Sequence, residues 1–180
     1  MTTVDGATTG ERVAVPWTVL PDYQCFGCSP HNPHGLELQF WTHPEGLESR
    51  FRLGRAFESY PGMVHGGVVG TVCDETMGNL LVLRAGRSAF TVSLRLRYLS
   101  PLAVDRDYRC VARWSTGGDD HHLCHASAEV LDADGQSMVT ATGVYQPVSM
   151  ERARQHLVLT DDEAALLQRR MTKPPSPNGV

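Results

Sequence analysis

The stretch from Pro61 to Gly78 constrains the fold of this 180-residue chain more than any other. It opens as a turn-forming loop, passes through the glycine pair Gly66-Gly67 and continues as a long apolar segment. We expect a helix over about 66–84 that ends near Gly86, because glycine commonly terminates helices. A helix that is apolar nearly all round has to be buried, so the rest of the chain must cover it.

An acid pair, Asp74-Glu75, lies two turns inside this helix. A carboxylate there costs free energy unless it is paired, solvated or used. Gly70 and Gly78 lie four residues on either side of Asp74 and share its face, although each costs a helix roughly 1 kcal/mol relative to alanine. Bare backbone on both sides of one carboxylate predicts room for a substrate. Glu75 points about 100° away around the helix and is more often structural or at a dimer contact.

Two strands are predicted before the helix and four after it. Residues 36–43 and 47–53 alternate apolar and polar side chains, which is the pattern of half-buried strands. Turn-forming residues separate the four later strands, at about 89–100, 107–115, 121–131 and 137–147. Strands with one segregated helix predict an α+β domain, with an antiparallel sheet curled around that helix. Residues 150–156 and 161–171 look helical, and Thr160 to Glu163 form a capping sequence for the second.

Length and composition are those of one globular domain, with 41% hydrophobic and 20% charged residues. We divide the chain into a flexible N-terminus (1–16), a main domain (17–148), a helical extension (149–172) and a disordered tail (173–180). The net charge of −4 argues against nucleic-acid binding. The chain shows neither a membrane-spanning apolar run nor a signal-peptide pattern. Three cysteines in apolar segments indicate reduced, buried thiols in a cytoplasmic protein: Cys73, Cys110 and Cys124.

Three segments carry a family resemblance, in this order: 25–36, 62–78 and 90–101. The middle segment holds His65-Gly66-Gly67 and, eight residues after Gly66, Asp74. In this pattern the chain resembles the hotdog-fold thioesterase superfamily, in the acyl-CoA thioesterase branch named for phenylacetate degradation. The resemblance implies a hotdog domain over 17–148, in which a curled sheet wraps one long central helix. It also implies a homodimer or dimer of dimers, with sheets joined edge to edge and active sites at the subunit boundary.

The resemblance implies that Asp74 is the catalytic acid, because the family's general base or nucleophile lies eight residues after the first glycine of the His-Gly-Gly motif. The alternative is a partly exposed helix acid that caps or pairs with an arginine. Gly66 is the predicted oxyanion donor, since its N–H lies at the helix start, where the helix dipole favours negative charge. The Gly66-Gly67 pair can also serve only as a sharp turn from loop to helix.

Three further residues are candidates for the catalytic site. His65 can act as a base near neutral pH, and its more modest role is a hydrogen bond to backbone that fixes the loop. Glu58 stands where the family pattern often has glutamine. A carboxylate there can be a second base, bind an amine, or be solvated without a role. Thr91 aligns with a threonine or serine that some family members need beside the acid, and otherwise is an ordinary β-branched strand residue.

Gly67, Gly70 and Gly78 are predicted to border the substrate. By strand alternation Thr91 shares a face with Ser93, Arg95 and Arg97. Arg95 and Arg97 can meet the phosphates of coenzyme A or of a carrier-protein phosphopantetheine. Exposed strand arginines are also common without such a role.

Two clusters have the residue types of a zinc site. The first is Cys25-x-x-Cys28 with His31 and His34, where the resemblance implies a metal-free opening segment. In the second, strand alternation sends neighbouring side chains to opposite faces. Its members are His121, His122, Cys124 and His125. We therefore predict no metal, and no redox cofactor either.

The leading functional hypothesis is hydrolysis of an acyl thioester of coenzyme A or acyl carrier protein. The Gly66 N–H would polarise the carbonyl, and Asp74 would deliver water or attack directly. The alternative is a thioesterase-like biosynthetic enzyme that adds water or an amine at the β-carbon of an α,β-unsaturated acyl thioester. Glu58 and the strand arginines would suit a zwitterionic amine. A non-catalytic acyl-binding domain is disfavoured, because an acyl tunnel needs no buried acid.

Overall fold

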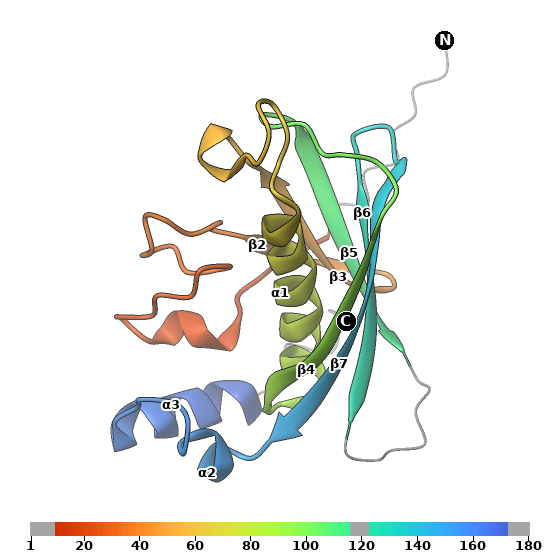
Figure 1. The fold of residues 1–180 in the computed structure, drawn as a ribbon. Coiled ribbons are helices and arrows are strands. Elements are labelled where there is room, and N and C mark those ends of the chain that lie inside the picture. The colour runs from red at the N-terminus through yellow and green to blue at the C-terminus, as the bar shows by residue number, and fades with distance from the viewer. Residues whose placement is uncertain (1–9, 116–122, 173–180) are drawn as a thin grey trace.

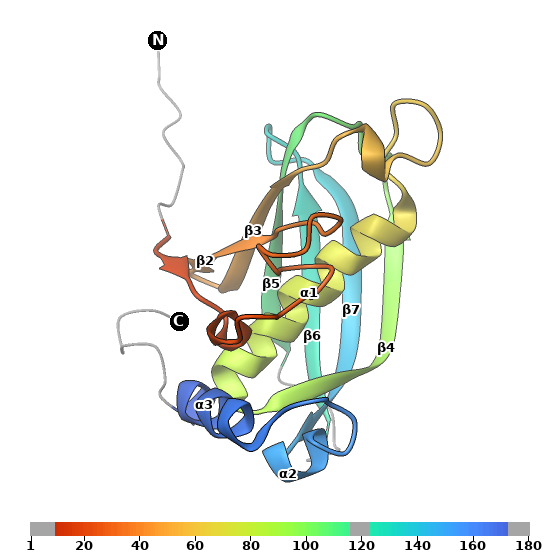
Figure 2. The ribbon, with the colours of Figure 1, turned by 90° about the vertical axis from the view of Figure 1, so that its left-hand side faces the viewer.

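Helix α1, Gly66–Ala85, lies against one face of a curled antiparallel sheet (Figures 1 and 2). The computed structural model describes residues 10–115 and 123–172. Within these residues the strands follow the sheet order β1-β2-β3-β5-β6-β7-β4, and every neighbouring pair is antiparallel. Their bounds are Arg12–Val13 (β1), Gln39–His43 (β2), Gly46–Arg52 (β3), Ser88–Tyr98 (β4), Asp107–Ser115 (β5), Cys124–Leu131 (β6) and Ser137–Val148 (β7). The predicted α+β class is confirmed.

Local signals at both ends explain why α1 spans the range predicted for it. His65 is the N-cap residue, and its Nδ1 accepts a hydrogen bond from the Gly67 N–H at 2.9 Å. Gly86 follows the helix with a φ of +62°, a left-handed conformation that glycine adopts without steric cost. Aliphatic side chains such as Leu80 and Leu81 are buried between these ends. The helix therefore begins and ends where its own sequence directs.

The side of α1 away from the sheet is covered by the segment that leads into β2. Figure 2 shows this segment, in red and orange, crossing in front of the helix. It begins with the 3-10 helix η1, Pro16–Val19, and its residues Cys28 and Leu36 belong to the same buried cluster as the helix. Protein on both sides accounts for a helix that is apolar nearly all round.

The N-terminal region differs from the sequence prediction in two places. The strand predicted at 36–43 begins only at Gln39, because Glu37 has a φ of +50°, which is incompatible with a strand. Within the range predicted as a flexible N-terminus (1–16), Arg12–Val13 pair with β2 and Val15 is buried. Residues 1–9 of that range lie outside the described residues.

Two helices follow β7. They are α2, Met150–Ala153, which is shorter than the helix predicted at 150–156, and α3, Asp161–Thr172, which packs against η1. Thr160 and Glu163 cap α3 reciprocally: the Thr160 N–H donates to Glu163 Oε2 at 2.8 Å, and the Glu163 N–H donates to Thr160 Oγ1 at 3.3 Å. The predicted capping sequence is confirmed.

Some predictions concern residues that the structure does not describe. The predicted tail 173–180 and the first residues of the strand predicted at 121–131 lie outside the described ranges. The division of the chain into domain, extension and tail stays a prediction. Within 10–115 and 123–172, no helix has the length and apolar character needed to cross a membrane.

Candidate active site

The Asp74 carboxylate is held by hydroxyl groups from two neighbouring strands. Thr91 Oγ1, on β4, donates to the two carboxylate oxygens at 3.1 and 3.3 Å. The Tyr145 hydroxyl, on β7, donates to Oδ1 at 2.9 Å. Thr91 and Tyr145 are directly opposite in the β4–β7 register, which explains why both reach the same carboxylate. Asp74 itself is half-buried, so its remaining lone pairs stay accessible.

Tyr145 was not identified from the sequence. Its ring is 1% exposed, and burial together with the nearby Asp74 charge raises the pKa of the phenol well above its usual value. The hydroxyl therefore stays protonated as a fixed donor. Gly143, two residues earlier on the same face of β7, makes room for the ring, since a Cβ there would lie 2.5 Å from Tyr145 Cε2. A tyrosine at an inward strand position was the available signal, because a buried phenol needs a hydrogen-bond partner.

A β-bulge in β4 overturns the predicted face of Thr91. The register shifts between Thr91 and Ser93, so one residue is left without a partner on β7. The extra residue reverses the alternation of the strand. Thr91 faces the helix, where it contacts Asp74, and after the bulge Leu94 and Leu96 continue on the same face and pack against the core. Arg95 and Arg97 each follow one of these leucines in the sequence, so they lie on the opposite face of the strand, where both are exposed. The prediction that Thr91 shares a face with the two arginines is wrong.

The start of α1 presents backbone to its surroundings. The Tyr98 hydroxyl donates to the Gly66 carbonyl at 2.7 Å, and the His65 N–H donates to the Phe57 carbonyl at 2.8 Å. Among the described residues no group accepts a hydrogen bond from the Gly66 N–H. His65 uses its Nδ1 to cap Gly67, which is the loop-fixing hydrogen bond expected as its modest role. The Gly66 N–H is thus a donor without a partner at the positive end of the helix.

One chain does not bring Asp74 and Gly66 together. They are eight residues apart on one helix, and a rise of 1.5 Å per residue separates them by about 12 Å. A single thioester carbonyl cannot contact both groups at that distance. If both act on one substrate, they come from different copies of the chain.

Glu58 has partners of its own. Its carboxylate accepts a hydrogen bond from the Gly62 N–H at 3.0 Å and pairs with Arg55 at 3.3 Å. The Gly62 N–H, and after it the Arg55 guanidinium, hold the pKa of Glu58 below its usual value. Glu58 also lines a pocket of about 650 Å³ beside the helix start, together with His65, Val68, Phe57, Phe26 and His34. These contacts indicate that Glu58 stabilises the loop that precedes α1.

The surroundings of the glycines of α1 differ from one position to the next. A Cβ at Gly70 would lie 3.7 Å from Leu96, and a Cβ at Gly78 would lie 3.9 Å from Tyr145. Both are ordinary van der Waals distances, so a Cβ would fit at either position, and the role of Gly70 and Gly78 beside the substrate stays a prediction. A Cβ at Gly67 would lie 3.1 Å from His65 Nδ1, so this glycine lets the cap form.

Glu75 points away from Asp74, toward the segment that covers the helix. Its Oε1 accepts a hydrogen bond from Asn79 Nδ2 at 2.8 Å, and its Oε2 lies 3.6 Å from Cys25 Sγ. Burial, followed by the charge of Cys25, raises the pKa of Glu75 to about 7. The two adjacent acids thus occupy separate environments.

The other cysteines behave largely as predicted. Cys73 and Cys110 are buried free thiols, but Cys124 is only half-buried. In the second of the two candidate zinc clusters, His121 and His122 lie outside the described residues.

Comparison with known proteins agrees with this geometry. The family model of the thioesterase superfamily matches residues 61–139, which include the start of α1, Asp74 and Thr91. No curated protein matches the sequence.

The chain is also similar to solved structures. One is a thioesterase superfamily protein, with a TM-score of 0.61, 20% identity and coverage of 68% of this chain and 62% of that one. A phenylacetic acid degradation-related protein from Ralstonia eutropha JMP134 has a TM-score of 0.57, 26% identity and coverage of 67% and 92%. A Streptococcus mutans UA159 protein bound to acetyl CoA has a TM-score of 0.58, 18% identity and coverage of 72% and 96%. The chain spans less than two thirds of the length of the first of these.

The fold and the site define a hotdog-type α+β protein with a hydrogen-bonded carboxylate on its central helix. These comparisons confirm the predicted resemblance to the hotdog-fold thioesterase superfamily. A phenylacetic acid degradation-related protein is among the similar structures.

Proposed function

We propose that the protein hydrolyses an acyl thioester, with Asp74 as the catalytic carboxylate. The observation that carries this proposal is the pair of hydroxyl donors, Thr91 and Tyr145, that fix the Asp74 carboxylate on the central helix. A carboxylate that is oriented and still half-exposed can deliver a water molecule or attack a carbonyl. A purely structural acid would need no such opening.

In the proposed reaction, water adds to the thioester carbonyl and the C–S bond breaks. Asp74 takes a proton from the attacking water, which leaves a free carboxylic acid and a thiol. The Gly66 N–H of the partner subunit stabilises the oxyanion, because a free N–H at a helix start favours developing negative charge. Removal of one such donor typically costs about 3 kcal/mol of transition-state stabilisation.

A dimer joined through β4 is supported by the sheet order. In the part of the sheet that the structure describes, β4 is the last strand and pairs with β7 alone. It exposes Val92 and Tyr98, and Leu99 directly after the strand is exposed as well; these are large apolar side chains for a free sheet edge. Pairing of two such edges would bring Thr91 and Asp74 of one subunit toward the helix start of the other. One substrate could then contact Asp74 of one subunit and the Gly66 N–H of its partner, although the two groups are about 12 Å apart within one chain.

Coenzyme A is the carrier that we propose for the acyl group. A protein of similar structure from Streptococcus mutans is bound to acetyl CoA. Acyl carrier protein is the alternative, and Arg95 and Arg97 are exposed on the outer face of β4, where they can contact phosphate of either carrier. Offering the same acyl group on both carriers separates the two.

Chemistry at the β-carbon receives less support. Glu58, proposed as the group that would bind an amine, is engaged with Gly62 and Arg55. Arg95 and Arg97 lie on the face of β4 that is turned away from Asp74. We therefore rank hydrolysis above chemistry at the β-carbon. Mass spectrometry tests this ranking, by comparing the products from saturated and 2-enoyl thioesters with and without glycine. A product heavier by one glycine would reverse it.

The Asp74→Asn variant tests the role of the carboxylate. We expect turnover to be lost while the melting temperature stays close to wild type, because asparagine keeps an oxygen that accepts from Thr91 and Tyr145. Asp162→Asn is the matched control, since Asp162 is an exposed acid on α3. Full activity of Asp74→Asn would remove Asp74 from the mechanism. In ¹⁸O-water, label found in an Asp74 peptide after one turnover would indicate nucleophilic attack, whereas label only in the product acid agrees with water attack.

A further inference from the structure

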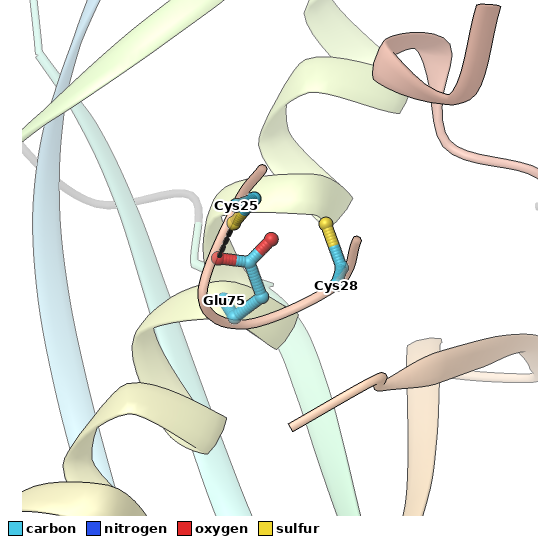
Figure 3. Close-up of side chains that lie close together, drawn as sticks. All are labelled: Cys25, Cys28 and Glu75. Atoms are coloured by element: carbon cyan, nitrogen blue, oxygen red, sulfur yellow. Dashed lines mark hydrogen bonds between the residues drawn. The ribbon is translucent and has the colours of Figure 1, made fainter. Parts of the chain in front are cut away.

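Two cysteines and a glutamate converge where the covering segment meets α1 (Figure 3). Cys25 and Cys28 come from the segment, and Glu75 comes from the helix. One donor atom from each, two sulfurs and a carboxylate oxygen, all lie within 4.8 Å of one another. Cys28 is buried, and the other two side chains are half-buried. The three groups thus form a small polar cluster within an apolar contact.

One pair of these atoms has the spacing of two ligands of a tetrahedral zinc ion. With a Zn–S bond of about 2.3 Å and a Zn–O bond of about 2.0 Å, a tetrahedral angle separates sulfur and oxygen ligands by about 3.5 Å. Cys25 Sγ and Glu75 Oε2 lie 3.6 Å apart. The pair therefore needs almost no movement to share one ion.

Neighbouring groups orient each of the three side chains. Asn79 Nδ2 donates to Glu75 Oε1 at 2.8 Å, which leaves Oε2 turned toward Cys25. The Gly27 N–H donates to Cys25 Sγ at 3.3 Å, and the Tyr23 hydroxyl lies 3.1 Å from Cys28 Sγ. Partners of this kind fix the ligands of metal sites and tune their affinity.

The cluster lacks a positive charge. In the part of the chain that the structure describes, no ion pair includes Glu75. Three acidic groups this close together repel one another when ionised, and burial adds to that cost. A divalent cation would neutralise most of the charge of two thiolates and one carboxylate.

We propose that Cys25, Cys28 and Glu75 bind one Zn²⁺ ion and leave its fourth position to water or another small ligand. Thiolates favour zinc over magnesium and calcium, which prefer oxygen ligands. His31 and His34, the ligands that the sequence suggested beside the two cysteines, do not belong to the cluster. The prediction of no metal rested on the family resemblance, and it weighed the two cysteines with those histidines rather than with a ligand on the helix.

The bound ion would fasten the covering segment to α1 one residue from Asp74. The same segment supplies Phe26 and His34 to the pocket beside the helix start. Zinc would therefore stabilise one wall of that pocket without entering the reaction. This role is separate from the proposed hydrolysis and can be tested without any substrate.

The test measures zinc binding by the full-length chain. Protein purified without chelator is analysed for metal content, and the affinity of the apoprotein for Zn²⁺ is measured by competition with a chromogenic chelator. We expect one zinc per chain in the wild type and in the control Cys124→Ser, whose thiol lies outside the cluster. Cys25→Ser and Glu75→Gln should lose more than tenfold in affinity, and Asn79→Ala should lose roughly 10- to 100-fold. Melting curves show whether each variant folds.

Two wild-type measurements keep the proposal testable if the variants fail to fold. Co²⁺ added to the apoprotein should give thiolate-to-metal charge-transfer bands and the visible bands of a tetrahedral ion. Chelation should increase hydrogen exchange within residues 23–36. The proposal is overturned if the wild type binds no stoichiometric zinc, if Cys25→Ser binds zinc as tightly as Cys124→Ser, or if a Cys25–Cys28 disulfide forms and the reduced protein still binds none.

Discussion

Replacement of Tyr145 by phenylalanine removes the hydroxyl that donates to Asp74, at 2.9 Å to Oδ1 and more weakly at 3.4 Å to the backbone carbonyl. The phenol donates to Asp74 Oδ1 at 2.9 Å from a side chain that is 1% exposed. A hydrogen bond to a charged group is worth about 1.5–3 kcal/mol. Since each 1.36 kcal/mol is tenfold in rate, kcat should fall roughly ten- to a hundredfold. KM should change little, because the hydroxyl contacts Asp74 rather than the substrate.

Steady-state kinetics with an acyl-CoA and a thiol reagent measure the effect. The phenylalanine ring still fills the space above Gly143, and Asp74 keeps Thr91 and solvent, so the melting temperature should stay near that of the wild type. Tyr108→Phe is the matched control, because its hydroxyl accepts a hydrogen bond from the Ala103 N–H and none from a residue of the site. The control should lose stability and keep its kcat. Wild-type kcat in a folded Tyr145→Phe protein would refute the role of this hydrogen bond.

Substitutions at three further positions test the same structure. Thr91→Val should lower kcat about tenfold through loss of the second donor, and Thr91→Ser should restore most of it; equal kinetics of the two variants would contradict this. Gly143→Ala should displace the Tyr145 ring and lower both kcat and stability, the latter by about 1–3 kcal/mol, which kinetics and thermal melts detect. Gly86→Ala should cost about 1–2 kcal/mol, because alanine is strained at a φ of +62°, and an unchanged melting temperature would argue against this helix end.

Local signals account for what the sequence predicted correctly. The bounds of α1 depend on a cap at His65 and a left-handed Gly86, both of which act within a few residues. The capping sequence of α3 is local for the same reason. Asp74 could be selected as a candidate because an acid in an apolar helix is costly wherever the helix packs.

The bulge in β4 shows where local reasoning fails. Strand alternation assumes one residue per position, and the extra residue between Thr91 and Ser93 reverses the faces of everything that follows. No glycine or proline marks the place. The direction of Arg95 and Arg97 was therefore decided by the pairing of β4 with β7, which the sequence of β4 does not contain.

By itself the sequence determined the central helix, the class of the fold and the acid at its middle, because periodicity, caps and the cost of a buried charge are properties of short segments. Only the tertiary structure brought Tyr145 to Asp74 across 71 positions and Cys25 to Glu75 across 50. Contacts of that range depend on how the sheet curls around the helix and on which loop covers it. They are set by the packing of the whole chain, so the partners of both acids became visible only in three dimensions.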